Sequence, residues 1–252
     1  MRAVHGSERL TKDIDLDAAD YVSNDSLIKA VRRSINNMFA TGVLRNPHYS
    51  EPKQTETTLR WKIEGELPGD GHVVHLTVEV SRRPSPFTEN VQTAPLGASF
   101  GAMAGKVNIQ VLDSQALAAS KVLAITSPNR DAPRDLYDLN VLIDARVTPP
   151  IALLARIPNA KILLPAAVNE LWPKIEAMSF DRFQQEVSAY LPEEAAAAIT
   201  EESFDDMRLR VAEQVDAWLK AAIKQLSPGT LETEASATEA PDGDPVHERM
   251  RP

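Results

Sequence analysis

The sequence predicts a mixed α/β (α+β) fold followed by a helical C-terminal half, on the basis of three observations. Apolar and polar residues alternate in several short runs within the first 112 residues, a pattern typical of half-buried β-strands. Between residues 113 and 144, apolar residues recur at helical spacing. After Pro149 and Pro150 the pattern is helical only. We therefore expect an α/β domain over residues 1–148 and a helical domain over residues 149–226.

The chain begins with a short predicted strand and a predicted helix. The stretch Asp-Ile-Asp-Leu-Asp at 13–17 alternates strictly, which predicts a strand. Residues 23–42 place apolar side chains three and four positions apart, which predicts a helix. We expect its N-cap at Asn24 or Asp25 and its end at Gly42.

A predicted β-hairpin and one more predicted strand follow. The runs 57–66 and 72–80 both alternate, and the connector 67–71 between them contains Pro and Gly, which favours a turn. The run 106–112 predicts another strand.

Two predicted helices close the α/β half. They cover 113–126 and 132–144, and Pro133 suits the first turn of the second helix, where its missing N–H leaves no hydrogen bond unmade. The helical half, 151–226, contains no motif that we can interpret. We expect it to pack against the α/β half, with a contact to substrate or partner as the alternative.

Composition limits the class of protein. With 252 residues, of which 43% are hydrophobic, the chain can form a sizeable core. It contains no cysteine, which excludes disulfides, thiolate metal sites and cysteine nucleophiles. No apolar run reaches the roughly 18 residues of a membrane span, and the first ten residues lack the apolar centre of a signal peptide. We expect a cytoplasmic protein without membrane contact.

The last 26 residues, 227–252, are rich in Glu, Thr, Ala and Pro and have almost no large apolar side chains. Such a segment cannot offset its ordering entropy, so we expect a disordered acidic tail. The formal net charge of the chain is −9, which argues against indiscriminate nucleic-acid binding. Part of this charge lies in the tail, so a local basic groove and an RNA partner remain compatible with the sequence.

Three aspartates on the first predicted strand form the first candidate site. Asp13, Asp15 and Asp17 occupy every second position, so their side chains share one face. Flexible carboxylates at this spacing can hold one or two divalent cations, and Mg²⁺ prefers such oxygen ligands. Nucleotidyl transfer uses this arrangement because cations neutralise the charge that develops on phosphate oxygens. The alternative is a solvated strand face, which is our interpretation of Asp17.

Glu79 is a candidate third ligand. It lies within the predicted strand 72–80, on the face opposite Val78 and Val80. A carboxylate at this position either faces solvent or joins the aspartates from a neighbouring strand.

A third group of charged residues lies on and between the two predicted helices. Lys121 stands in an otherwise apolar helix, where it either extends along the surface or reaches a phosphate as a point charge. Arg130 and Arg134 follow. Asp135 and Asp138 lie one helical turn apart and share a face. They either interact with the helix dipole and pair with Arg134, or they orient Lys121 and take part in a reaction.

Two parts of this sequence resemble a known family. The stretch R-L-T-K-D-I-D-L-D at 9–17, followed by A-L-A-A-S-K-V-L-A-I at 116–125 and R-D-A-P-R-D-L-Y-D-L at 130–139, is similar to motifs of the AbiEii/AbiGii nucleotidyltransferase toxins, including the mycobacterial MenT toxins. The resemblance runs from residue 2 to residue 145. The two parts together are much more specific than either alone.

The resemblance implies a polymerase-β-like nucleotidyltransferase core with a mixed sheet, and a toxin of a toxin–antitoxin or phage-defence system. It implies Mg²⁺-dependent transfer of a nucleotide from a nucleoside triphosphate (NTP) to RNA, at the 3′ acceptor end of tRNA. It also implies a cognate antitoxin as partner.

Residue roles follow from the same resemblance. The implied metal ligands are Asp13, Asp15 and Glu79. The implied catalytic residues are Asp13, Asp15, Lys121 and Asp135. The implied nucleotide-binding residues are Thr11, Lys121, Arg130 and Arg134. Thr11 also matches a position that is modified during neutralisation in some members of the family.

One departure from the family concerns the start of the chain. Family members carry a Gly-Gly or Gly-Ser turn that opens a helix before the aspartate strand, and its backbone amides help to hold the triphosphate. Here eight residues precede Arg9, and Gly6-Ser7 stands too close to Asp13 for such a turn and its helix. We therefore expect this Gly-Ser turn to be missing from the N-terminal domain.

Other functions fit the residues less well. A degenerate nucleotidyltransferase fold that only binds nucleotide, RNA or antitoxin is the main alternative. Another Asp-x-Asp enzyme, such as a glycosyltransferase, would leave Lys121 and the 130–139 motif unexplained. The five histidines show neither a nucleophile-elbow context nor the spacing of a zinc site.

Overall fold

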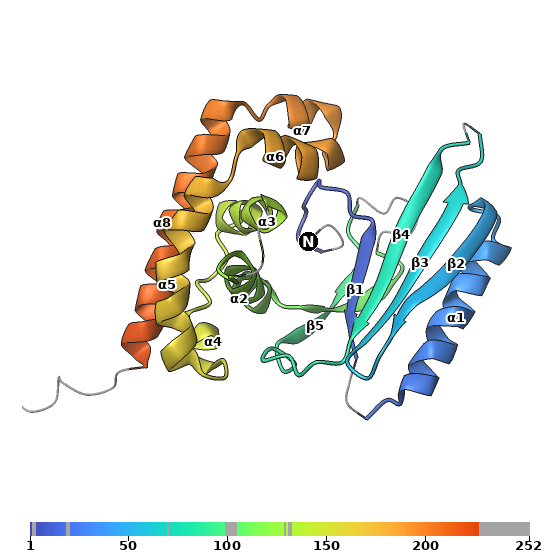
Figure 1. Ribbon diagram of the computed structural model, residues 1–252, viewed down its shortest axis with the longest axis horizontal. Coiled ribbons are helices and arrows are strands. Elements are labelled where there is room, and N and C mark those ends of the chain that lie inside the picture. Colours follow the sequence, from blue (N-terminus) through green and yellow to red (C-terminus); the bar gives the residue numbers. More distant parts are fainter. Residues whose placement is uncertain are drawn as a thin grey trace, which may run out of the picture.

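The computed structural model describes residues 1, 4–18, 21–69, 71–98, 105–128, 130 and 133–226. The chain forms two bodies, a β-sheet backed by one helix and a layer of helices, and the first strand is the edge of the sheet that faces the helices (Figure 1). The predicted acidic tail, 227–252, lies outside the described residues.

The main sheet has four strands in the order β1-β4-β3-β2. β1 (Asp13–Asp17) runs parallel to β4 (Val73–Ser81), whereas β3 (Thr58–Glu66) is antiparallel to both β4 and β2 (Arg45–Gln54). The predicted first strand, the predicted hairpin and the mixed sheet are thereby confirmed.

The sequence analysis missed β2. This strand contains Pro47 and Pro52, and its pairing with β3 is interrupted by two register shifts. Proline lacks the N–H that a central strand needs, so it is confined to edge strands and bulges. β2 satisfies both conditions, because it forms the edge of the sheet and is bulged.

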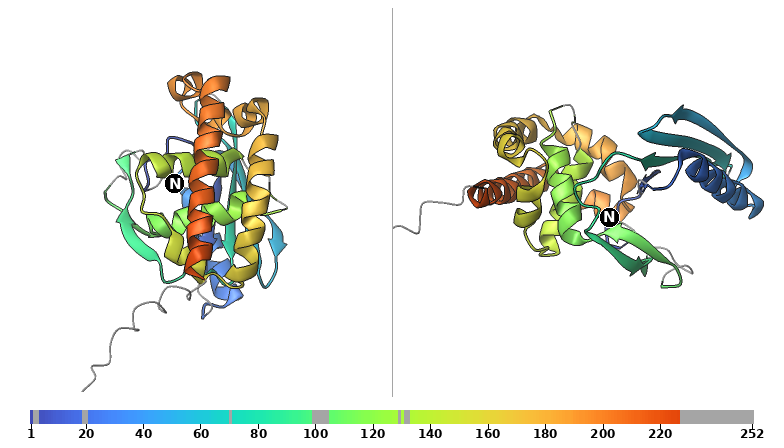
Figure 2. Two further views of the ribbon diagram at one scale, coloured as in Figure 1. Left: turned by 90° about the vertical axis from the view of Figure 1, so that its left-hand side faces the viewer. Right: turned by 90° about the horizontal axis from the view of Figure 1, so that it is seen from below.

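Helix α1 (Asn24–Ala40) covers one face of the sheet (Figure 2). Ile35 of α1 packs with Leu59, Trp61 and Val80 of the sheet in a small hydrophobic core. The predicted N-cap at Asn24 or Asp25 is wrong, because the hydroxyl of Ser23 accepts the hydrogen bond from the N–H of Ser26. A serine one residue earlier satisfies the free amides equally well.

A second, two-stranded sheet connects the main sheet to the helices. It pairs β5 (Val91–Pro95) with β6 (Asn108–Leu112) in antiparallel fashion. β6 was predicted, whereas β5 was not. β6 leads directly into α2, whose N-cap is Asp113.

The helical layer holds the larger hydrophobic core and includes the remaining elements of the described chain. They are α2 (Ser114–Ile125), α3 (Pro133–Asp144), α4 (Ile151–Arg156), α5 (Ala160–Ala177), α6 (Phe180–Glu186), the 3₁₀ helix η2 (Ser188–Tyr190), α7 (Glu193–Ala197) and α8 (Glu201–Gln225). The core takes side chains from α2 and α3 as well as from α4 to α8. The predicted boundary between residues 148 and 149 therefore does not separate two hydrophobic cores. Within the described part of the chain, no helix combines the length and hydropathy needed to cross a membrane.

The larger core generates a first prediction. Leu139 of α3 is fully buried, so Leu139→Ala should lower the free energy of unfolding by about 2–5 kcal/mol through lost burial and the cavity left behind. Leu209 of α8 is 48% exposed, and Leu209→Ala should change it by less than about 1 kcal/mol. Urea denaturation followed by circular dichroism measures both, and equal losses would contradict this assignment of the core.

Candidate functional site

The pairing of β1 with β4 brings the predicted metal ligands together. Asp15 is the register partner of Glu79, and Asp13 is the partner of Thr77. Because register partners and alternate residues share a face, Asp13, Asp15 and Glu79 all lie on the sheet face opposite α1. The pKa of Asp15 is raised, first by partial desolvation and then by the charges of Asp13 and Glu79. The charges of Asp13 and Glu79 therefore disfavour ionisation of Asp15.

These carboxylates fit a divalent cation in chemistry. Their oxygens are the ligands that Mg²⁺ prefers, and a cation would relieve the repulsion that raises the pKa of Asp15. Glu79 is engaged elsewhere in this structure, since Nε of Arg60 lies 2.6 Å from its Oε2. Among the described residues no three such side chains are already arranged around a common point. Asp13 and Asp15 would hold the ion, and Glu79 would join after leaving Arg60.

Two other residues of the first motif have different surroundings. Asp17 is the register partner of Ser81, and its pKa is raised by desolvation alone, without a contribution from the other carboxylates. Thr11 accepts a hydrogen bond from the backbone N–H of Asp13 on its hydroxyl, at 3.1 Å. Thr11 therefore shapes the entry into β1 and lies next to the carboxylates.

Lys121 lies at the centre of a second charged cluster, between α2 and α3. Its Nζ is 2.8 Å from Oδ1 of Asp135 and 2.7 Å from Oδ2 of Asp138. Burial lowers the pKa of Lys121, but Asp138 and Asp135 raise it, and the net shift is upward. Lys121 is therefore a firmly protonated cation.

Two further cations complete the charge balance of this cluster. Arg130 lies 2.9 Å from Oδ2 of Asp135, and Arg9 lies 3.2 Å from Oδ2 of Asp138. The carboxylates of Asp135 and Asp138 are 1% and 0% exposed. Burial of such charges is costly unless they are paired, and three cations share the two carboxylates here.

Arg134 of α3 connects the Lys121 cluster to the carboxylates of β1. Its guanidinium lies 3.4 Å from Oδ2 of Asp13, a contact between residues 121 positions apart. Of the two alternatives for Asp135 and Asp138, the structure therefore favours contact with Lys121 over pairing with Arg134. Arg134 points to the β1 carboxylates because Lys121, Arg130 and Arg9 already neutralise the aspartates of α3.

Two residues of the site were missed in the sequence. Arg9 opens the first motif, and only the fold shows that it pairs with Asp138. Arg60 is the register partner of Glu79 across the β3–β4 hairpin. Symmetric pairing of the predicted runs about the connector 67–71 would set Arg60 opposite Val78, and the observed register, which pairs Glu66 with Val73, places it opposite Glu79 instead.

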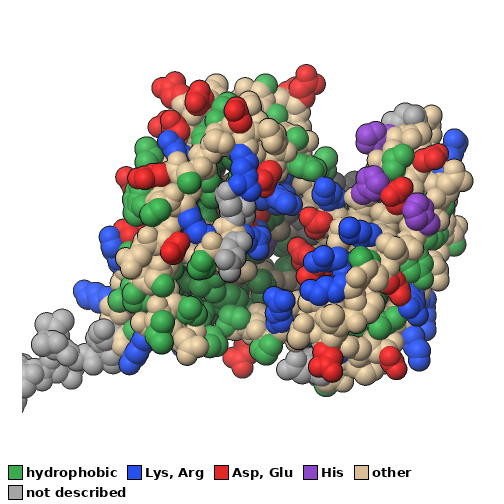
Figure 3. Space-filling view, viewed as in Figure 1, with side chains coloured by type: hydrophobic (Ala, Val, Ile, Leu, Met, Phe, Trp, Pro, Cys, Tyr) green, Lys and Arg blue, Asp and Glu red, His purple; other side chains and the backbone are tan. Residues whose placement is uncertain are grey.

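The surface around these groups is hollowed between the helical layer and the sheet. Figure 3 shows Lys and Arg side chains on both sides of this hollow, with acidic side chains between them. In the described residues no helix follows Gly6 and Ser7, and the next element is β1.

Comparison with solved structures and curated proteins gives distant likenesses. Two structures from Helicobacter pylori are similar to this chain, each with a TM-score of 0.46. The protein JHP933 is 15% identical over 88% of this chain and 80% of its own. A candidate nucleotidyltransferase is 17% identical over 86% of this chain and 80% of its own. No curated protein matches the chain.

Comparison with protein families gives a match that covers the whole described part of the chain. The family described as "Nucleotidyl transferase AbiEii toxin, Type IV TA system" matches residues 1–226. The match includes the β1 carboxylates, the Lys121 cluster and the helical layer. The chain therefore belongs to the AbiEii family of nucleotidyl transferase toxins of type IV toxin–antitoxin systems.

Proposed function

We propose that this toxin is a Mg²⁺-dependent nucleotidyltransferase that transfers a nucleoside monophosphate from an NTP to RNA, at the 3′ acceptor end of tRNA. One observation carries the proposal. The carboxylates of Asp13 and Asp15 lie beside Arg134 and the Lys121 cluster, and this proximity supports a cation site next to groups that could bind phosphate. The reaction would take place in the cytoplasm, where NTPs and tRNA occur together, and phage defence is its expected setting.

The proposed transfer forms one bond and breaks one bond. The 3′ hydroxyl oxygen of the acceptor bonds to the α-phosphorus of the NTP, the bond from that phosphorus to the bridging oxygen breaks, and pyrophosphate leaves. The hydroxyl proton passes to a carboxylate of the β1 cluster or to water. When bound, Mg²⁺ supplies positive charge to the phosphate oxygens.

The residues of the chain would bind and orient the triphosphate. Arg134 and Arg130 are 44% and 55% exposed, so their guanidinium groups can reach a ligand from their present positions. Lys121 would contribute positive charge, and Asp135 would position it through the contact at 2.8 Å. Thr11 would contact the nucleotide from the turn before β1.

A binding protein without turnover is the second candidate. Two contacts favour it: Glu79 is held by Arg60, and Lys121 is held by both aspartates of α3. The experiments below separate the two functions.

The first experiment measures turnover. Incubation of the purified protein with labelled NTPs, MgCl₂ and total tRNA should label tRNA. Asp15→Asn should lower the rate by at least about 100-fold, because it removes a metal ligand. Asp17→Asn is the matched control, since this carboxylate lies on the same strand and face, and its rate should equal that of wild type. No labelling by wild type, or equal labelling by Asp15→Asn, would refute the enzymatic function.

The second experiment tests the metal site without turnover. Because the pKa of Asp15 is raised, its ionised form is less favourable in the folded than in the unfolded protein. Its contribution to stability is therefore greatest at acidic pH and is lost as pH rises through the folded-state pKa. In EDTA, Asp15→Asn should raise the melting temperature relative to wild type at neutral pH, and this difference should shrink in acid.

MgCl₂ should stabilise wild type and Asp17→Asn but not Asp15→Asn. The expected shift is about 2–4 °C for each kcal/mol of binding free energy. Differential scanning fluorimetry with and without EDTA measures it. An equal Mg²⁺ response in Asp15→Asn would place the cation elsewhere.

The third experiment tests Lys121. Lys121→Met removes the cation that contacts both buried carboxylates and leaves each of them with one arginine partner, so it should lower the free energy of unfolding by about 1–3 kcal/mol in urea denaturation. Lys161→Met changes an exposed residue of α5 and should have an effect below about 0.5 kcal/mol.

Arg134→Ala tests phosphate contact without removing a buried charge, and calorimetry should show about tenfold weaker binding of a non-hydrolysable NTP analogue. Unchanged binding by Arg134→Ala would exclude this contact.

A further inference from the structure

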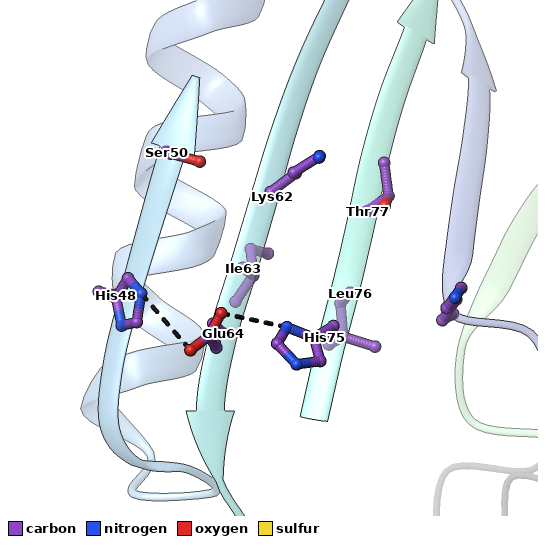
Figure 4. A pocket seen from close by; sticks show the side chains of 9 residues that line it. His48, Ser50, Lys62, Ile63, Glu64, His75, Leu76 and Thr77 are labelled. Atoms are coloured by element: carbon purple, nitrogen blue, oxygen red, sulfur yellow. Dashed lines mark ion pairs between the residues drawn. The ribbon is translucent and has the colours of Figure 1, made fainter. Parts of the chain in front are cut away.

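A polar hollow lies on the sheet face opposite α1, apart from the Lys121 cluster. We call it the β2–β3–β4 hollow, and its polar lining includes Lys12, His48, Lys62, Glu64, His75 and Thr77. It has a volume of about 320 Å³ and opens to solvent. The side chains come from three adjacent strands and from the turn before β1 (Figure 4).

The charges in this hollow favour an anion. Glu64 is the acidic residue of its lining, and its two oxygens face imidazoles: Nδ1 of His75 at 3.1 Å and Nε2 of His48 at 3.9 Å. Lys62 is exposed, points away from Glu64 and forms no ion pair with any described residue (Figure 4). Lys12 adds a second ammonium group, which lies 6.0 Å from the ring centre of Tyr190. The hollow thus presents two lysines against one acid that is already engaged.

The hollow and the proposed cation site share a row of the sheet through Thr77. Lys62 is the register partner of Thr77, and Thr77 is the register partner of Asp13. These three residues therefore form one row across the sheet. Lys62 lies two strands from Asp13, a separation of about 10 Å between backbones. A single nucleic-acid strand bound in the hollow could therefore reach the β1 carboxylates.

The stereochemistry of phosphoryl transfer decides which substrate would occupy this hollow. Attacking and leaving oxygens lie on opposite sides of the reacting phosphorus, roughly in line. Pyrophosphate would leave toward Arg134, Arg130 and Lys121, which lie on the helical side of β1. The attacking hydroxyl must then approach from the other side of β1, where β4, β3 and β2 lie (Figure 1).

We infer that the β2–β3–β4 hollow binds the phosphodiester backbone of the acceptor RNA, close to its reacting 3′ end. This inference rests on the proposed nucleotidyl transfer. Lys62 and Lys12 are the phosphate contacts, the hydroxyl of Thr77 is a neutral donor beside them, and Glu64 restrains the two histidines.

The test measures RNA binding without NTP, so it does not depend on turnover. The probe is a fluorescent single-stranded oligoribonucleotide, and anisotropy gives its Kd for the full chain across a series of KCl concentrations. Lys62→Ala should weaken binding by about three- to fivefold. The slope of log K against log[KCl] should also fall in magnitude by about 0.7, the value for one lost phosphate contact on a single strand.

Two more variants check the sign and the place of the effect. Glu64→Gln removes the negative charge of the hollow, so it should tighten RNA binding, whereas loss of a merely structural contact would not. Lys29→Ala is the matched control, because Lys29 is exposed on α1, which covers the opposite face of the same sheet. Its Kd and salt slope should equal those of wild type.

Several results would overturn the inference. They are absence of RNA binding by wild type, wild-type affinity in both Lys62→Ala and Glu64→Gln, or an equal loss in Lys29→Ala. Poly-L-glutamate serves as a competitor, and displacement as efficient as that by unlabelled RNA would assign the hollow to an acidic protein partner instead.

If wild type labels tRNA but the hollow variants bind RNA normally, only this inference fails. If wild type labels nothing but the variants change RNA affinity as expected, RNA binding by the hollow stands and the transfer reaction fails.

Discussion

The position of residues 9–17 between two hydrophobic cores is the constraint on which the site depends. Arg9 pairs with Asp138, and the backbone N–H of Leu10 donates to the carbonyl of Tyr190 at 2.7 Å, so this segment starts on the helical layer. It then becomes β1 and pairs with β4. The apolar side chains of β1 are about half exposed, so hydrophobic burial holds the strand only weakly. The polar contacts of Arg9 and Leu10 and the backbone pairing with β4 therefore determine where its carboxylates lie.

Charge balance explains why residues of the two motifs depend on one another. Two carboxylates of α3 are almost fully buried, and each needs compensation from elsewhere in the chain. Lys121 comes from α2 and Arg9 from the N-terminal segment, 129 residues away from Asp138. Removal of either cation would leave a buried carboxylate with fewer partners in a medium that solvates it poorly. The same compensation leaves Arg134 available to the β1 carboxylates.

The arrangement places positive charge on both sides of the acidic strand. Cations of α2, α3 and the loop between them lie on one side, and Lys62 of β3 lies on the other. A reaction between two anionic substrates meets strong repulsion unless both are neutralised. Separate basic surfaces that meet at a carboxylate-bound cation would meet this requirement, although the chain as a whole carries a net charge of −9.

Alternation and helical spacing were sufficient to predict β1, the β3–β4 hairpin, β6 and the helices α1 to α3, because these patterns depend on local geometry. They also predicted that Asp13 and Asp15 share a face. β2 was not predicted because its two prolines interrupt the alternation and are typical of a bulged edge strand. No local pattern could show that the helices on both sides of residue 148 share one hydrophobic core. The contacts of Arg9 with Asp138 and of Arg134 with Asp13 were equally hidden. Periodicity shows the face on which a side chain lies, but its partner is decided by strand register and by the packing of segments more than a hundred residues apart.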